Sequence, residues 1–528
     1  MAEVPTFGGM SGKTLSRSIS SIATCGFLLF GYDQTSTEGV MAGIISAVPF
    51  NTVFPETKDN PTNQGFVTAI YEIGCLLGAV CIIWGGDMLG RRKSIILGAI
   101  IMAIGAIIQV TSFVGHQPYA QFIIGRIITG VGNGINTSTI PTYQAECSHT
   151  SNRGLLICIE GATIAFGTLI AYWIDYGASF GSGSFSWRFP ISFQIVFSIV
   201  ITLGMIWLPE SPRWLCMRDR SDEGEKVIAA LHGVEVNSPL VQAEKAAVME
   251  SIRASGEVGK PTPLSVVFTG GKTQHRRRMF LGVFGQLAQQ LSGCNAIIYF
   301  FPVLFEKSIG VDHNMATLLG GVNMIVYSIF ATTSWFLIER AGRRKLFLYG
   351  AAGQAISMTI TFACLIPNTP STAKGAAVGL FTYIASFGAT WLPLPWLYAA
   401  EISPIKTRAK ANALSTCSNW LFNFFIVMIT PVMLAGIGWG TYLFFAIINV
   451  CFLPIIYFFY PETAKRSLEE IDIIFAKGYC ENKNYVQAAK ELPYLTEEEI
   501  SRMDAEYGHE KGPGSESPSN EKASDSEQ

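Results

Sequence analysis

The sequence predicts an all-α membrane protein of twelve transmembrane helices, arranged as two six-helix halves. Three observations predict this fold class: an apolar composition, a series of apolar segments of spanning length, and an internal repeat. Of the 528 residues, 49% are hydrophobic and 14% are charged, and the mean hydropathy is +0.34. Soluble domains contain about 25% charged residues. The composition is therefore that of a polytopic membrane protein.

The composition and motifs also argue against several function classes. The net charge is −2, and the basic clusters are not interleaved with aromatic residues, so we expect no nucleic-acid partner. The eleven cysteines occur singly, without metal-ligand spacing, and are interpreted as small apolar helix residues. No HExxH, GxSxG or P-loop pattern is present, so we expect neither an enzyme nor a bound metal or cofactor.

Twelve segments are long and apolar enough to cross a bilayer, which takes about 20 residues. They lie near 20–48, 65–85, 94–113, 119–140, 155–177, 188–208, 278–301, 314–338, 346–366, 375–399, 410–434 and 440–460. Loops two, four, eight and ten between them contain eleven basic residues, and the odd-numbered loops contain four. The positive-inside rule then places both termini in the cytoplasm. We expect a multi-pass protein of the plasma membrane.

The chain divides into five predicted parts. They are a cytoplasmic N-terminal segment at 1–19, a six-helix bundle at 20–208, a cytoplasmic helical linker at 209–275, a second bundle at 276–475, and a cytoplasmic tail at 476–528. Amphipathic stretches around 221–231 and 241–253 predict short surface helices in the linker. The tail is acidic and rich in Ser, Gly and Pro, which predicts that it is mostly disordered, above all from Gly508.

Three motifs recur at an offset of about 250 residues. GDMLGRRK at 86–93 returns as IERAGRRK at 338–345, and PESPRWL at 209–215 returns as PETAKRSL at 461–468. A glutamate seven residues before an arginine also occurs twice, at 146 and 153 and at 401 and 408. Such a repeat indicates two related halves with a binding site between them near the bilayer midplane.

The repeated acids and arginines fall at predicted cytoplasmic helix ends. There they can form ion pairs that latch the two halves in one conformation and break in the other. The alternative is that the basic residues only set topology, which explains GRRK but not the acids at matched spacing. The predicted latch residues are Arg91, Glu146, Arg153, Arg343, Glu401 and Arg408.

These motifs, together with QQLSGCN at 289–295, resemble the sugar porter family of the major facilitator superfamily over about 20–475. The resemblance implies the major facilitator fold and alternating-access transport of a small polyhydroxylated substrate, with the lipid bilayer as environment. We expect a monomer. The stretches INTSTIP (135–141), WRFP (187–190) and STCSNWLFNF (415–424) are most similar to the fungal glycerol:proton symporter branch.

Polar residues inside apolar spans are costly, so each is a functional candidate. Amides donate and accept hydrogen bonds, as hydroxyls do, and the seventh span contains Gln289, Gln290 and Asn295. Hydrogen bonding between helices is the alternative role. The resemblance implies that these amides contact the substrate, and that further residues line the same cavity. Those residues are Trp396, Asn419, Trp420 and Tyr327.

Two charged residues, Asp33 in the first span and Arg126 in the fourth, are candidates for proton coupling. The resemblance to proton-coupled sugar porters implies that Asp33 is the proton site and Arg126 its partner, and a structural ion pair is the alternative. Glu160 in the fifth span either assists the proton path or binds a polar neighbour. Compared with the family pattern, Thr35–Glu38 are four extra residues, which puts coupling in doubt more than fold.

The leading functional hypothesis is proton-coupled uptake of a glycerol-like polyol or a monosaccharide, with the proton as coupling ion. Gly161 and Tyr327 stand where the family has two hexose-binding amides, and Gly388 stands where facilitative glucose carriers have a glutamate. The incomplete hexose set favours a small polyol. The alternatives are a facilitative hexose or pentose carrier, an exporter of a secondary metabolite, and a nutrient sensor without transport.

Overall fold

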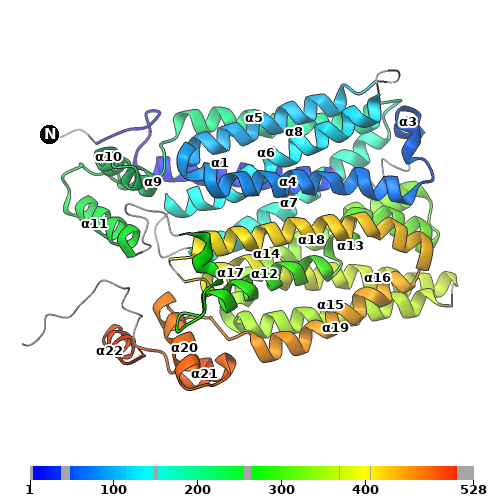
Figure 1. Cartoon of the computed structure of the whole chain (residues 1–528). Coiled ribbons are helices and arrows are strands. Elements are labelled where there is room, and N and C mark those ends of the chain that lie inside the picture. Colours follow the sequence, from blue (N-terminus) through cyan, green and yellow to red (C-terminus); the bar gives the residue numbers. More distant parts are fainter. Residues whose placement is uncertain are drawn as a thin grey trace, which may run out of the picture.

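The computed structural model describes residues 4–36, 48–113, 115, 117–147, 153–254, 263–367, 369–404 and 406–507. Within these ranges the chain is helical apart from its connections, and the β-structure amounts to an isolated bridge between Phe7 and Met10. Two groups of long helices lie side by side, and shorter helices gather at one end (Figure 1). The predicted all-α fold is confirmed.

The first half contains six long helices and a short excursion between the first two. The long helices are α1 (Gly12–Ser36), α4 (Pro61–Leu89), α5 (Arg91–Val110), α6 (Pro118–Glu146), α7 (Arg153–Ser179) and α8 (Phe185–Trp207), and α3 (Val48–Val53) and η1 (Pro55–Thr57) lie between α1 and α4. Glycines allow α6 to approach α4 closely. A Cβ atom at Gly130 would lie 2.2 Å from the Tyr71 carbonyl oxygen, and one at Gly134 would lie 2.1 Å from that of Cys75.

The second half repeats this arrangement, with its first and fourth spans interrupted. Its helices are α12 (His275–Leu291), α13 (Cys294–Leu304), η4 (Phe305–Ile309), α14 (His313–Ala341), α15 (Arg343–Leu365), α16 (Pro370–Ser386), η5 (Phe387–Trp391), α17 (Leu394–Ile402), α18 (Arg408–Ile437) and α19 (Gly440–Phe459). Pro393 and Pro395 mark the break before α17, as proline cannot continue the backbone ladder. Gly293, at φ 95°, separates α12 from α13. The sequence did not predict this second break.

Nine helices among the described residues are long and apolar enough to cross a membrane. The other three predicted spans correspond to α1, α6 and α7, of 25, 29 and 27 residues. All three contribute residues to the cavity described below. The first span was predicted to continue to residue 48, whereas α1 ends at Ser36 and residues 37–47 lie outside the described ranges.

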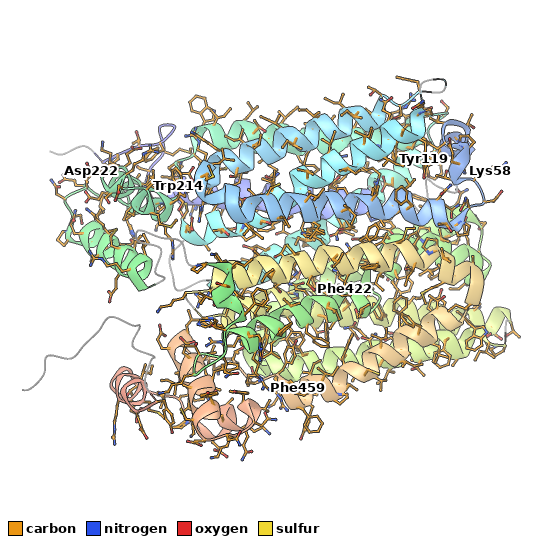
Figure 2. The ribbon with its side chains drawn as sticks, viewed as in Figure 1. Lys58, Tyr119, Trp214, Asp222, Phe422 and Phe459 are labelled. Carbon is orange, nitrogen blue, oxygen red and sulfur yellow. The ribbon has the colours of Figure 1, made fainter. Side chains whose placement is uncertain are left out.

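The short helices define one end of the molecule, which we call the insert end. They are α9 (Pro212–Met217), α10 (Ser221–His232), α11 (Pro239–Ala254), η3 (Leu264–Phe268), α20 (Leu468–Cys480), α21 (Tyr485–Glu491) and α22 (Glu497–Tyr507). Trp214 and Asp222 lie at this end, while Lys58 and Tyr119 lie at the opposite end, called the far end (Figure 2). The linker helices predicted around 221–231 and 241–253 are confirmed.

The prediction of a mostly disordered tail is wrong for residues 476–507. These residues form the end of α20 and the helices α21 and α22. Ile474 of α20 packs with Ala488 and Leu492 in a small apolar cluster, and Asn484 caps α21 through its side chain. Acidic composition concealed these few apolar positions. Residues 508–528 lie outside the described ranges.

Candidate functional site

A cavity of about 430 Å³ lies between the two halves. Its wall is formed by α1, α4, α6 and α7 of the first half and by α12, α13, α14, η5, α17 and α18 of the second half. The lining continues toward the insert end as far as Arg91, Lys406 and Lys410, of which Lys406 is exposed. The cavity is therefore accessible from the insert end.

At the far end the two halves are in direct contact. The Tyr172 hydroxyl of α7 donates to the carbonyl oxygen of Ile298 in α13. A Cβ atom at Gly320 of α14 would lie 3.0 Å from the Tyr172 ring, and one at Gly65 of α4 would lie 2.4 Å from the Met428 carbonyl oxygen of α18. Such close backbone approach leaves no passage there. This conformation is open at the insert end and closed at the far end.

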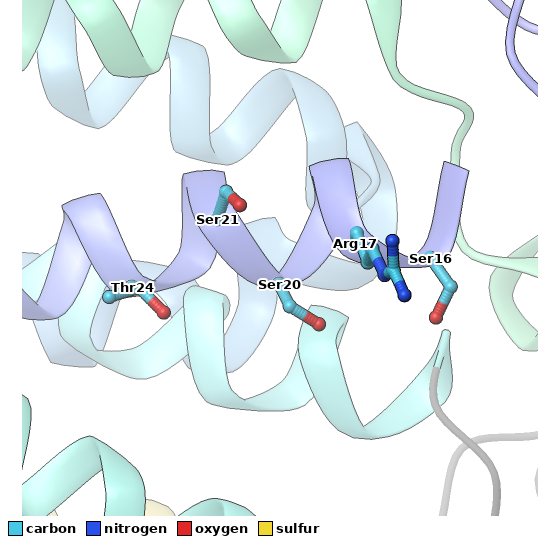
Figure 3. Close-up of a pocket in the computed structure, with 5 residues that line it drawn as sticks. All are labelled: Ser16, Arg17, Ser20, Ser21 and Thr24. Atoms are coloured by element: carbon cyan, nitrogen blue, oxygen red, sulfur yellow. The ribbon is translucent and has the colours of Figure 1, made fainter. Parts of the chain in front are cut away.

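Several polar side chains of α1 lie near the open end of the cavity. Ser16, Arg17, Ser20, Ser21 and Thr24 line a pocket of about 480 Å³ along this helix (Figure 3). At 100° per residue, Ser16 and Ser20 lie on nearly the same side of α1 as the cavity-lining side chains further along it. Ser16 and Ser20 therefore place polar atoms on the side of α1 that faces the central cavity further along the helix.

Gln289 lines the cavity, but both of its amide atoms are bound to protein. Its Nε2 donates to the carbonyl oxygens of Trp391 at 2.7 Å and Leu392 at 3.1 Å, and its Oε1 accepts from Asn419 Nδ2 at 3.0 Å. Pro395 has no N–H group, so the Trp391 carbonyl lacks its usual helical donor. Gln289 supplies that donor. Gln289 therefore forms hydrogen bonds between helices, which is the alternative to substrate contact given for the seventh-span amides.

Three other amides each have one polar atom that is free to bind a ligand in the cavity. They belong to Gln290, Asn295 and Asn419. Asn295 Nδ2 donates to Gln290 Oε1 at 2.8 Å and to Asn423 Oδ1 at 2.6 Å. Asn419 Nδ2 also donates to Gln286 Oε1 at 2.7 Å. Within the described part of the chain, Gln290 Nε2, Asn295 Oδ1 and Asn419 Oδ1 have no protein partner. These three amides thus present one donor group and two acceptors to the cavity, beside the other polar side chains that line it.

Two of the three predicted aromatic residues line the cavity, Trp396 and Tyr327. The Tyr327 ring stacks on Phe387, with centroids 6.2 Å apart. A Cβ atom at Gly388 would lie 3.1 Å from the Tyr327 ring, so any side chain at this position would require α14 or η5 to shift by a few tenths of an ångström. Gly161 also lines the cavity, and a Cβ atom there would be 3.7 Å from its nearest neighbour, which is ordinary contact.

Trp420 does not line the cavity. It is fully buried and meets the Phe30 ring edge-on, with centroids 5.8 Å apart, and Phe30 in turn lines the cavity. The physical reason is helix geometry, since consecutive residues point about 100° apart and Asn419 already faces the cavity. Trp420 therefore supports the wall from behind, which corrects its predicted place.

Asp33 and Arg126 are both fully buried and meet around Tyr71 of α4. The Tyr71 hydroxyl donates to Asp33, and the Arg126 guanidinium carbon lies 5.5 Å from the centre of the Tyr71 ring. Arg126 also donates to the Thr68 carbonyl oxygen at 2.6 Å. Asp33 is absent from the cavity wall, whereas Glu160 lines it. The sequence did not identify Tyr71, because a tyrosine in an apolar span is indistinguishable from a packing residue. The side chains of Thr35–Glu38 lie outside the described residues.

The predicted latch residues form the same cluster twice at the insert end. Arg91 pairs with Glu146 at 3.1 Å, and Arg343 pairs with Glu401 at 2.8 Å. Both clusters lie within one half, because each GRRK loop joins helices of its own half. The pairs therefore join helices of the same half, and a role in latching the two halves stays a prediction. Arg408 donates to the Ser403 carbonyl oxygen at 3.3 Å, and the side chain of Arg153 lies outside the described residues.

The acids of the PES and PET motifs complete these clusters. The backbone N–H of Arg91 donates to Glu210 at 3.0 Å, and that of Arg343 donates to Glu462 at 2.8 Å. A carboxylate at the first turn of α5 and of α15 interacts favourably with the helix dipole. The two halves therefore repeat in three dimensions what the motifs repeat in sequence.

A helical bundle of two related halves around a central polar cavity defines a membrane transporter. The chain matches the family described as "Sugar (and other) transporter" over residues 19–475. It is 45% identical over 499 residues to "Sugar transporter STL1" of Saccharomyces cerevisiae, covering 93% of this chain and 87% of that one. It is 44% identical over 517 residues to the major facilitator superfamily transporter mfsA of Aspergillus fumigatus, covering 95% and 94%.

Solved structures agree with this fold. The proton:xylose symporter XylE bound to 6-bromo-6-deoxy-D-glucose superposes with a TM-score of 0.73 at 24% identity, over 88% of this chain and 100% of that chain. The inward open conformation of the xylose transporter XylE from E. coli gives 0.72 at 25% identity, over 87% and 99%. The chain belongs to the sugar porter family of the major facilitator superfamily, and it is a transporter and not an enzyme.

Proposed function

We propose that the protein takes up a small polyol or a monosaccharide together with a proton, by alternating access. The observation that carries this proposal is the pairing of two features in one bundle. Amide atoms of Gln290, Asn295 and Asn419 face the cavity between the halves, and a buried carboxylate, Asp33, lies with Tyr71 and Arg126 one layer behind its wall. We place the insert end and both termini in the cytoplasm of the plasma membrane, following the basic loops.

Asp33 is the proposed proton site. When Asp33 is ionised, the Tyr71 hydroxyl and the Arg126 guanidinium both stabilise its charge, which ties α1 to α4 and α6. Protonation removes that charge and weakens the tie between these helices. A proton bound from outside therefore favours rearrangement of the first half, and its release inside restores the tie. Glu160 on the cavity wall is the proposed group that accepts the proton from Asp33 before its release into the cytoplasm.

The cavity supports a small polyol better than a hexose. Gln290 Nε2, Asn295 Oδ1 and Asn419 Oδ1 match a molecule with three hydroxyls such as glycerol, and Tyr327 and Trp396 cover its C–H faces. A pyranose has more hydroxyls, and each one left unpaired in a closed cavity costs about 1–3 kcal/mol. Gly161 provides no polar atom for them.

Facilitated diffusion of a pentose or hexose is the second candidate. It is favoured by the position of Asp33, which is fully buried and outside the cavity wall in this conformation. A structural role for the Asp33–Tyr71–Arg126 group would be compatible with that burial.

Counterflow in proteoliposomes with labelled glycerol, xylose and glucose tests the substrate, with protein-free liposomes as the control for leakage. We expect exchange of glycerol above the control and weaker exchange of glucose. A protonophore then separates the two candidates, because it abolishes accumulation against a gradient but leaves counterflow intact. Accumulation that persists with the protonophore, or exchange of none of the three solutes, would refute the proposal.

A further inference from the structure

A buried carboxylate of the first half reaches the amides of the second half. Glu72 of α4 and Asn423 of α18 are both fully buried, and Asn423 Nδ2 donates to Glu72 Oε1 across the interface between the halves. Asn423 Oδ1 accepts from Asn295 Nδ2 at 2.6 Å. A continuous chain of hydrogen bonds therefore leads from Glu72 to Asn295 at the cavity wall.

When Glu72 is ionised, its charge sets the direction of this chain. An ionised carboxylate accepts hydrogen bonds and cannot donate them. Asn423 must then turn its NH2 group toward Glu72 and its oxygen toward Asn295. Asn295 must then donate to that oxygen through its own NH2 group, which also donates to Gln290 Oε1 at 2.8 Å.

The last two amides of the chain present opposite atoms to the cavity. Since Asn295 Nδ2 and Gln290 Oε1 bind each other, Asn295 Oδ1 and Gln290 Nε2 remain, and within the described residues neither atom has a protein partner. Both residues line the cavity. Without a fixed charge, a row of carboxamides is ambiguous, because each can rotate by about 180° and exchange its donor and acceptor.

We propose that Glu72 is a positioning residue that sets the hydrogen-bond polarity of the substrate site. Through Asn423 it makes Asn295 an acceptor for one substrate O–H group and Gln290 a donor to a second hydroxyl oxygen. The ligand class is therefore a molecule with two neighbouring hydroxyls, one of which donates a hydrogen bond to Asn295 while the other accepts one from Gln290. This inference rests on the proposed function for the identity of the ligand as a polyhydroxylated solute.

The burial of a carboxylate supports this role over plain packing. Acidic residues inside transmembrane bundles are costly, and a glutamine at position 72 would accept the same hydrogen bond from Asn423. What a carboxylate adds is that it cannot donate. The charge therefore removes the alternative orientation of Asn423, and with it the alternative orientation of Asn295.

The test compares hydroxyl with fluorine at single positions of the substrate. Fluorine replaces the oxygen as a weak acceptor and cannot donate, so an analogue fluorinated where Asn295 binds loses that contact. In the wild type, 1-fluoro-glycerol or the 3-deoxy-3-fluoro and 4-deoxy-4-fluoro sugars should include one analogue that inhibits counterflow on the order of tenfold less well than the parent. In Glu72→Gln this difference should fall to about threefold or less, because both amide orientations become accessible.

Three variants keep the result interpretable. Glu72→Asp retains an obligate acceptor and should preserve the discrimination, and Asn423→Ala should abolish it if Glu72→Gln fails to fold. Glu56→Gln makes the same chemical change at an exposed position of η1 and should leave the ratio at the wild-type value. A wild-type ratio in both Glu72→Gln and Asn423→Ala would overturn the proposal.

A ligand-free measurement separates this proposal from the proposed function. Glu72 and Asn295 communicate through Asn423, so a double-mutant cycle of melting temperatures for Glu72→Gln and Asn295→Ala should be non-additive. If glycerol, xylose and glucose all fail to exchange, the proposed function is refuted, while a non-additive cycle still supports the chain from Glu72. An additive cycle would overturn the positioning role whatever the substrate.

Discussion

Gly65 of α4 determines how closely the halves approach at the far end, and Gly65→Ala should shift the protein away from this conformation. A Cβ atom at Gly65 would lie 2.4 Å from the Met428 carbonyl oxygen, and real Cβ contacts are essentially never shorter than 3.0 Å. The two helices must therefore separate by at least about 0.6 Å, against a backbone atom that cannot rotate away. Overpacking of this kind costs about 1–3 kcal/mol.

That cost applies when the far end is closed and is relieved when the halves separate there. The ratio of molecules open at the insert end to molecules open at the far end should fall by roughly 5- to 150-fold. Labelling at Ala409→Cys, a position on the cavity wall near the insert end, measures this ratio once the labelling of the native cysteines in the parent protein is subtracted. Gly177→Ala in α7 is the matched control, because nothing lies within 4 Å of its added Cβ atom. Equal labelling rates in Gly65→Ala and Gly177→Ala would refute the reasoning.

Three further predictions concern coupling, substrate size and stability. Asp33→Asn should abolish accumulation driven by a pH gradient and preserve counterflow, and surviving accumulation would assign the proton to another residue. Gly161→Gln with Tyr327→Asn should raise glucose transport relative to glycerol transport. The expectation would be wrong if the wild type preferred glucose tenfold and the double variant transported glucose less well. Glu401→Gln removes the carboxylate that lies 2.8 Å from the Arg343 guanidinium and should lower the free energy of unfolding by about 1–3 kcal/mol. The measurement is the melting temperature in detergent, and an unchanged melting temperature would be incompatible with a stabilising cluster.

The fold was largely predictable from the sequence because spanning length and repeat spacing are properties of the chain alone. The predicted spans fall on the long helices of both halves, although the first was predicted to end beyond α1. The break in the tenth span lies at Pro393 and Pro395, residues that cannot continue a helical backbone ladder. The break at Gly293 was missed, since a glycine inside an apolar run equally indicates close packing. The order in the tail was missed because its core consists of a few apolar residues in an acidic segment.

The candidate site was predictable by residue type but not by contact. The polar residues of the seventh span were found because they interrupt an apolar run, and the same signal was available for Glu72, which the sequence analysis did not single out. Which amide atoms remain for the cavity depends on partners far along the chain, Asn423 for Asn295 and Trp391 for Gln289. Sequence spacing does not contain that information. Four of the six predicted latch residues form the two ion pairs, whereas the confinement of each pair to one half required the three-dimensional positions.

Proton-coupled uptake requires that substrate and proton cross the membrane together. The most direct measurement is the pH outside proteoliposomes that contain the purified protein, with the membrane potential clamped, when glycerol is added without any imposed proton gradient. Glycerol entry should make the external medium more alkaline, and Asp33→Asn should lack this signal while its counterflow continues. Glycerol entry at the wild-type rate with no change of external pH would contradict proton-coupled uptake.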